Sequence, residues 1–422
     1  MSRFSFLPGL MAAALFILPE IAAGQTERSP RAPEPLTLDE AVQLAVEAND
    51  PTVVRFEARA QALEDRAIAE AQLPDPMITG QIANLPVDSF AFDESNMSQV
   101  RLGLRQEFPP GRTLSIRGEQ RRHEAQAERA RRELALREIT LATRSAWFEL
   151  AWHGRAVDVV TEIRASVSEQ IDSLAGRFAT GRMNAQDVLR AELEMALLDD
   201  QLAEHRRKAE RARSILSRFV GGAAFRPVDA EWSVPEAPDP VPTLVDRLSE
   251  HPAVAIENAE IEAAEADVEI AEQAYKPAFA LEGGYGIRTD RADFASFGVT
   301  LSVPLFTDKR QDRQRAAAIS RRGAELHDRD ARLLDLKEQL DRALIDWRRY
   351  SERLSLYRLA LGERARQTAE ASIATYATGR TDFAELIRSQ LAELDVELKR
   401  AELRAEAGKA WARIVYLTGE SS

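Results

Sequence analysis

The sequence predicts a mainly α-helical protein with a small β part, built from very long helices folded into hairpins. None of the 19 prolines lies between Gly111 and Arg226 or after Pro304, and proline breaks helices because it removes a backbone donor and clashes with the preceding turn. The two proline-free blocks are rich in Ala, Leu, Glu and Arg, and only 6% of the residues are aromatic. This composition is typical of long or coiled helices rather than of a globular core.

The same turn occurs inside each block. Residues 178–182 read FATGR and residues 376–380 read YATGR. Glycine tolerates the left-handed backbone that commonly ends a helix, so Gly181 and Gly379 are predicted to mark where each block folds back on itself. The first helix of each hairpin is expected at about 113–178 and 310–376. Some 65 residues reach about 100 Å at 1.5 Å per residue, so these helices must pack along other helices.

The whole plan is duplicated. A helix is expected at 51–72 and again at 252–275, each opened by a proline that follows Asp50 or His251. Residues of the first half have counterparts in the same order in the second, namely Leu136, Trp147, Ala212 and Gly221 with Leu336, Trp347, Ala410 and Gly419. We therefore divide the chain into a first structural repeat at 37–228, a linker at 229–241 and a second repeat at 242–422.

Capping motifs and heptad spacing predict where a helix starts and which helix faces pack. Thr37-Leu-Asp-Glu40 has the capping-box pattern that starts a helix. After the second turn, apolar residues recur at alternating spacings of four and three and predict a coiled-coil seam at Ile387, Leu391, Leu394, Leu398, Ala401 and Ala405. After the first turn the seam is less regular, with Leu189, Leu193 and Ala196 followed by Asp200.

Four segments have the alternating pattern of strands. They are expected at 77–83 and 99–108 in the first repeat, and at 278–286 and 296–305 in the second. Strands of this length, tilted, span an outer membrane. A four-stranded sheet in lipid would leave two edges unpaired, so other chains must close it, and three copies give a twelve-stranded barrel. The alternative is a soluble hairpin pair that caps a coiled coil.

The first residues have the pattern of an export signal, assigned to residues 1–24. Arg3 precedes the apolar run Leu10–Leu18, and Ala22-Ala-Gly24 supplies small residues for cleavage. A membrane anchor is the alternative, but the run is too short to span a bilayer. Residues 25–36 are polar and proline-rich and predict a flexible leader. The net charge of −13 argues against nucleic acid as the main partner.

The order of these elements resembles the TolC-type outer-membrane efflux factors over essentially the whole mature chain. Within them it looks most like the CzcC/CusC-like heavy-metal branch, whose first repeat is similar to the segments Pro74–Met77, Asn84–Val87 and Gln106–Pro109. The segment Leu301–Phe306 resembles the strand ending in the second repeat of the family. The resemblance implies a homotrimer with a β-barrel in the outer membrane and an α-helical barrel that extends into the periplasm. It also implies docking to a periplasmic adaptor (membrane fusion) protein and an inner-membrane RND-type transporter.

The resemblance places both turns at the periplasmic tips of the hairpins. The predicted adaptor contacts are Gly181, Arg182, Gly379 and Arg380. Alternatively, the two arginines only cap helix ends, where a cation favours the helix dipole.

A periplasmic gate is expected just beyond the turns, at Asp187, Asp382, Glu385 and Arg388. The Glu385 position matches one where the family places acidic residues that constrict the tunnel. Three copies would form a carboxylate ring that attracts cations. Arg388 departs from the family, which has an acidic residue there in some members, and an Arg ring or Glu385–Arg388 pairing between subunits could alter the gate. The alternative for each carboxylate is a solvated helix face.

No catalytic or metal-binding motif is found. The histidines His123, His153, His205, His251 and His327 are scattered, there is no cysteine and there are six methionines, so no cofactor, no metal site and no enzymatic activity are expected. The predicted function is a passive outer-membrane channel of a tripartite efflux pump, with heavy-metal cations as candidate cargo. The alternatives are the duct of a type I protein secretion system, which shares this fold, and a periplasmic coiled-coil scaffold.

Overall fold

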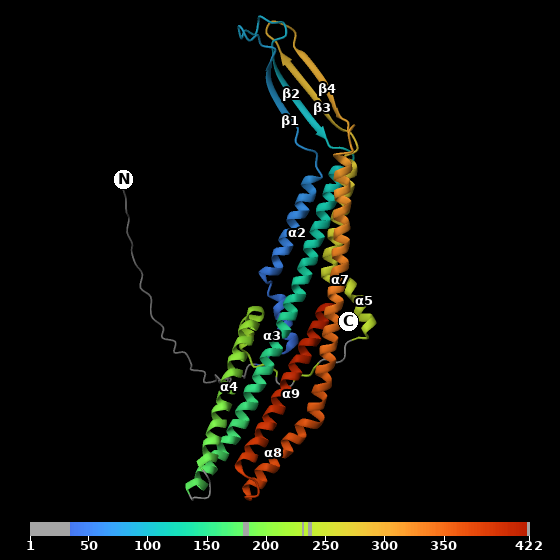
Figure 1. Ribbon diagram of the computed structural model, residues 1–422. Helices are drawn as coiled ribbons and strands as arrows, with labels where there is room; N and C mark the ends of the chain where they lie inside the picture. Colours follow the sequence, from blue (N-terminus) through green and yellow to red (C-terminus); the bar gives the residue numbers. More distant parts are fainter. Residues whose placement is uncertain (1–33, 180–184, 230–231, 235–238, 420–422) are drawn as a thin grey trace, which may run out of the picture. The chain divides into compact units, whose positions relative to one another are not determined.

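The structure is a computed structural model that describes residues 34–179, 185–229, 232–234 and 239–419 (Figure 1). The predicted signal peptide, most of the predicted leader and the tip residues Gly181 and Arg182 lie outside the described residues. Leu36, placed at the end of the leader by the sequence, is fully buried. All elements named below belong to the unit Pro35–Ser422.

The first repeat starts with two capped helices. The hydroxyl of Thr37 accepts a hydrogen bond from the backbone N–H of Glu40 at 3.3 Å, and the carboxylate of Asp50 accepts one from Thr52 at 2.8 Å, as both motifs predict. The elements in order are α1 (Leu38–Glu47), α2 (Pro51–Glu70), β1 (Met77–Ala83), β2 (Gln99–Phe108), α3 (Thr113–Ala179) and α4 (Ala185–Val220). A short 3₁₀ turn at Gly221–Phe225 follows.

The second repeat has the same order with one difference. Its elements are α5 (Val241–Arg247), α6 (Pro252–Gln273), β3 (Ala278–Ile287), β4 (Phe294–Ser302), α7 (Gln311–Leu356), α8 (Gly362–Ala377) and α9 (Phe383–Thr418). The single helix expected at 310–376 is divided by a π-helical turn at Tyr357–Leu361, where Gly362 donates to the carbonyl of Tyr357. No proline accompanies this turn, so the proline criterion could not reveal it.

The described strands form one antiparallel sheet in the order β1-β2-β3-β4, so the two repeats meet at the central β2–β3 pair. The rings of Phe108 and Phe279 stack across this pair, with centroids 4.7 Å apart. β4 begins and ends earlier than the predicted 296–305. Its end at Ser302 is consistent with Pro304, which has no N–H for a sheet ladder.

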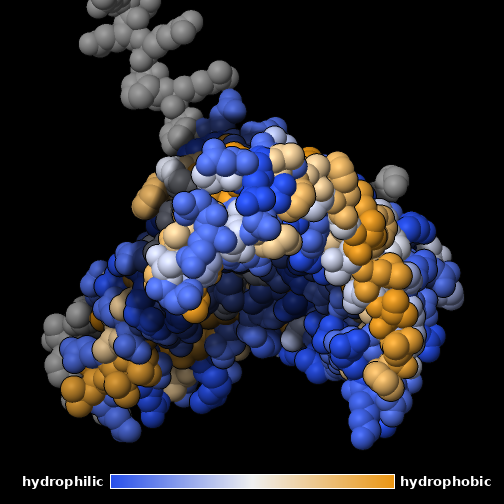
Figure 2. All heavy atoms as spheres, turned by 90° about the horizontal axis from the view of Figure 1, so that it is seen from above, coloured by the Kyte–Doolittle hydropathy of each residue, from blue (hydrophilic) through white to orange (hydrophobic). Residues whose placement is uncertain are grey.

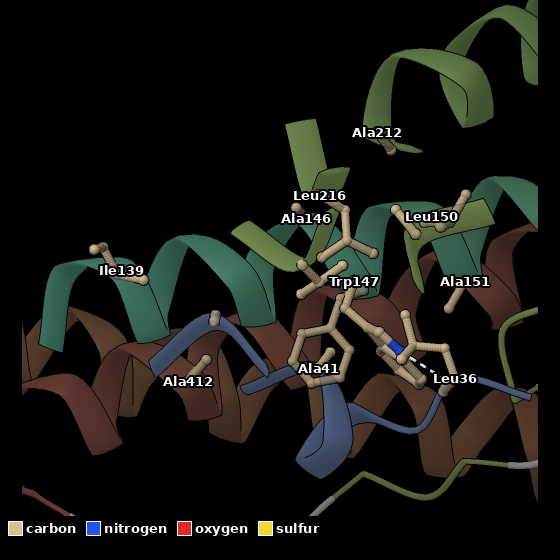
Figure 3. Packing of buried hydrophobic residues seen from close by; sticks show 14 of the residues in the cluster. Leu36, Ala41, Ile139, Ala146, Trp147, Leu150, Ala151, Ala212, Leu216 and Ala412 are labelled. Atoms are coloured by element: carbon tan, nitrogen blue, oxygen red, sulfur yellow. Dashed lines mark hydrogen bonds between the residues drawn. The ribbon is translucent and has the colours of Figure 1, made fainter. Parts of the chain in front are cut away.

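The long helices pack side by side below the sheet (Figure 1), and α3 contacts α2, α4, α6 and α9. At 67 residues, α3 reaches about 100 Å from the sheet to the α3–α4 turn. Its buried Trp147 donates the indole N–H to the carbonyl of Leu36 at 3.0 Å (Figure 3). Leu36 also forms a bridge with Val228, which ties the start of the repeat to its end.

The two turns are followed by helices that bury different residues. In α9, the predicted seam is confirmed, because Ile387, Leu394 and Ala405 are buried. Leu391 and Leu398 pack against the cluster that holds Ile387 and Leu394. In α4, where the expected seam is less regular, Leu189 and Leu193 are exposed in the single chain. The buried residues are instead Ala191, Leu198 and Leu202.

Candidate functional site

The sheet has one apolar face. The register pairs Leu102 with Tyr285 and Leu281 with Val299, and alternation along each strand then places their i±2 neighbours on the same side. This face carries Ile78, Ile82, Val100, Leu102, Leu104, Phe279, Leu281, Tyr285, Ile287, Phe297, Val299 and Leu301. All of them are exposed in the single chain, up to 91% for Phe297. Figure 2 shows hydrophobic residues gathered in patches between hydrophilic surface.

The opposite face of the sheet is polar and internally bonded. Arg101 on β2 donates to the hydroxyl of Ser296 on β4 at 2.7 Å, and Arg105 lies 3.1 Å from the carboxylate of Glu282. The first contact passes over Gly284, where a Cβ would lie 2.9 Å from the Arg101 Nε. Glycine is therefore required for the long arginine to reach across β3.

This arrangement suits one segment of the wall of a transmembrane β-barrel. One face matches hydrocarbon and the other matches an aqueous lumen, which is the pattern of transmembrane β-barrels. Among the described residues, β1 and β4 each pair on one side only, and an open edge does not persist in lipid. In the described part of the chain, no helix has both the length and the apolarity needed to cross a bilayer.

The second turn is a glycine-ended helix cap. Gly379 has a φ of +73°, its N–H donates to the carbonyl of Tyr376 at 3.0 Å, and the N–H of Arg380 donates to that of Thr375 at 2.9 Å. This pair of bonds is the Schellman motif. The side chain of Arg380 is exposed beyond it, so both predicted tip residues of the second hairpin lie where a partner can reach them.

The predicted gate residues of the second hairpin lie on the first turn of α9. Asp382 caps the helix, with its carboxylate accepting from the N–H of Glu385 at 2.8 Å. Glu385 forms an ion pair with Arg388 of the same chain, one turn further on. Both are exposed. The pairing predicted between subunits is thus available within one chain.

Asp187 lies in the first turn of α4 and is partly exposed. Its position after the first turn corresponds to that of Glu385 after the second. Gly181 and Arg182, which the sequence places at the tip before it, lie outside the described residues.

The structure brings together two histidines that the sequence separates. The Nδ1 atoms of His153 on α3 and His205 on α4 lie 3.2 Å apart. The Nε2 of His153 lies 3.5 Å from the carboxylate of Glu149, which accepts a hydrogen bond from Lys409 of α9 at 2.7 Å. No regular spacing links the two histidines, so only the pairing of α3 with α4 reveals them.

Three carboxylates also converge, on α6 and α7. Oxygens of Glu257, Glu260 and Glu325 lie within 4.8 Å of one another. Burial and the neighbouring carboxylates raise the pKa of Glu260, although Arg131 opposes this rise. Arg131 pairs with Glu260 and Arg332 lies 3.5 Å from Glu257, so arginines neutralise most of this cluster.

Comparisons with known proteins find matches to part of the sequence and to the fold. Residues 243–420 match the model of a family described as outer membrane efflux protein. The cobalt-zinc-cadmium resistance protein CzcC of Cupriavidus metallidurans is 25% identical over 320 residues, which cover 72% of this chain and 73% of CzcC.

Two solved structures share the fold. A membrane protein from Pseudomonas aeruginosa matches with a TM-score of 0.78 and 17% identity, over 90% of this chain and 93% of that one. CusC matches with a TM-score of 0.77 and 13% identity, over 91% and 92%. The chain therefore shares the fold of these solved structures, with its two-faced sheet and duplicated helical hairpins, and its residues 243–420 match the outer membrane efflux protein family.

Proposed function

We propose that this chain is the outer-membrane channel of a tripartite efflux pump that exports divalent heavy-metal cations. The observation that carries the channel role is the sheet, which has an apolar face, a polar face and two open edges. Three copies close these edges into a twelve-stranded barrel, and the long helices continue the duct into the periplasm. The chain is a passive conduit rather than an enzyme.

The cargo is proposed from sequence likeness. The relative CzcC is described as a cobalt-zinc-cadmium resistance protein, and the segments that resemble the heavy-metal branch lie in the first repeat. A duct conducts cations through polar lining and charge. The polar sheet face, with Arg101, Arg105 and Glu282, supplies a lining without a strong single charge.

The hairpin tips are proposed as the periplasmic working end. Gly379 and Arg380 at the second turn, with Gly181 and Arg182 at the first, would contact the adaptor. Asp187, Asp382, Glu385 and Arg388 would form the gate. The exposure of Arg380, Glu385 and Arg388 in the single chain supports this proposal.

The test is complementation in a host that lacks its own outer-membrane duct but has a matching adaptor and RND pump for metal cations. Expression of this chain is expected to restore tolerance to Zn²⁺, Co²⁺ and Cd²⁺. A matched control carries a lipid-face charge that blocks barrel formation. Restored secretion of a type I protein substrate without metal tolerance would overturn the proposal that the cargo is metal cations. Recovery of the chain in the soluble periplasm would overturn the channel itself.

A further inference from the structure

A polar cluster lies between α3, α4 and α9, away from the strands and the tips. Its centre is the His153–His205 pair, with Nδ1 atoms 3.2 Å apart. Two imidazole nitrogens that bind one tetrahedral ion at about 2.0 Å lie about 3.3 Å from each other. The observed separation fits that arrangement.

We propose that His153 and His205 form a binding site for a divalent transition-metal cation of the Zn²⁺, Cu²⁺ and Ni²⁺ class. Imidazole is a preferred ligand of these ions. The two side chains come from different helices of one hairpin, so a bound ion would join α3 to α4. The binding site has a fixed place on the hairpin, and the proposal of this site does not depend on which cargo the channel exports.

Glu149 supplies the support that a histidine ligand needs. Its carboxylate lies 3.5 Å from the Nε2 of His153, on the ring edge opposite to His205. A metal-bound histidine almost always directs its second nitrogen to a carboxylate, carbonyl or water, which holds the proton there and frees the other nitrogen for the metal. Lys409 holds this carboxylate at 2.7 Å, so Glu149 is a positioning residue.

The surroundings keep both rings neutral. Burial is the main cause that lowers the pKa of His153, to about 4, and that of His205. A neutral ring is the form that binds metal. Two nearby ammonium groups oppose a cation, but Lys409 pairs with Glu149 and Glu406 at 2.7 and 2.6 Å, and Lys208 lies 3.2 Å from Glu204.

Access to the site comes from His205. Its side chain is half-buried, whereas His153 is only 8% exposed. Two protein ligands leave the remaining coordination positions to water. The site is therefore suited to a reversibly bound ion rather than to a closed structural one.

The experiment uses the full-length protein, purified in detergent without a polyhistidine tag. Cu²⁺ serves as a paramagnetic probe and Zn²⁺ as the ligand for calorimetry. The wild type is expected to show nitrogen couplings from two imidazoles. His205→Asn is expected to lose one imidazole coupling and at least tenfold in Zn²⁺ affinity. His123→Asn, which changes a partly exposed histidine elsewhere on α3, is the matched control and is expected to bind as the wild type does.

Glu149→Gln tests the positioning role. It keeps the side-chain shape and is expected to weaken Zn²⁺ binding by about 10- to 100-fold while the two nitrogen couplings remain. Equal binding by the wild type and His205→Asn would overturn the site and leave His153 and His205 as a hydrogen-bonded pair only. Failure of metal export in cells has no bearing on this result, because binding is measured on the purified protein.

Discussion

The ring of Phe148 on α3 lies directly against Gly408 on α9. A Cβ at Gly408 would lie 2.7 Å from the Phe148 Cε1. The glycine therefore sets how closely α9 approaches the longest helix, at the level of the Trp147 cluster.

Gly408→Ala is expected to destabilise the protein by about 1–3 kcal/mol, because the added methyl group overpacks against a buried ring. Gly323→Ala on α7 is the control, since nothing lies within 4 Å of its Cβ position, and it is expected to stabilise by about 0.5–1 kcal/mol. Urea midpoints of the purified proteins measure both. Equal shifts in the two variants would show that the contact has no energetic role.

The two faces of β4 predict opposite tolerance to charge. Val299→Arg places a cation on the apolar face and is expected to cost about 2–4 kcal/mol in the membrane. Thr300→Arg, one residue on, faces the polar side beside Glu282 and is expected to leave assembly intact. Heat-modifiable trimers in outer-membrane fractions provide the measurement. Loss of trimers with Thr300→Arg but not with Val299→Arg would invert the assignment of the faces.

Glu385 holds Arg388 by an ion pair within the chain. Glu385→Gln combined with Asp187→Asn is expected to raise the ion conductance of reconstituted channels, because the proposed gate ring then loses its carboxylates and Arg388 loses its partner. Glu363→Gln on α8 is the matched control, since Glu363 forms the same kind of i,i+3 pair with Arg366. An unchanged conductance in the double variant would dismiss this gate.

His251 predicts a dependence of stability on pH. Burial and the nearby Arg137 lower its pKa to about 4, below about 6.5 in the unfolded chain. The unfolded state therefore binds the proton first, so the stabilisation is complete above pH 6.5 and is lost as the pH falls towards 4. At pH 5 the free energy of unfolding is expected to have fallen by about 2 kcal/mol from its value at high pH.

In the wild type, the Nδ1 of His251 caps α6 by accepting from the N–H of Ala253 at 3.2 Å. His251→Asn removes the titrating group but keeps a side chain that can cap the helix. The free energy of unfolding, measured in denaturant at pH 7 and pH 5, should fall less in this variant than in the wild type. His153 contributes to the fall in both proteins. The same fall in both would mean that His251 does not titrate in this range.

The elements that the sequence predicted well have local causes. Thr37 and Asp50 bond to backbone groups two or three residues away, and the start and end of β1 and β2 follow from alternation and flanking turns. The sequence did not predict the interruption at Tyr357–Leu361 or the buried face of α4. The buried face of α4 depends on contacts with other helices rather than on neighbours in sequence.

By itself, the sequence determined the helices, the strands, the apolar and polar sides of the sheet and the duplication, because periodicity, proline and glycine act over a few residues. Only the tertiary structure decided which helices meet. It placed Gly408 against Phe148 and set His153 beside His205. Such contacts join residues on different helices, and their distances depend on how whole helices pack, which no local pattern records.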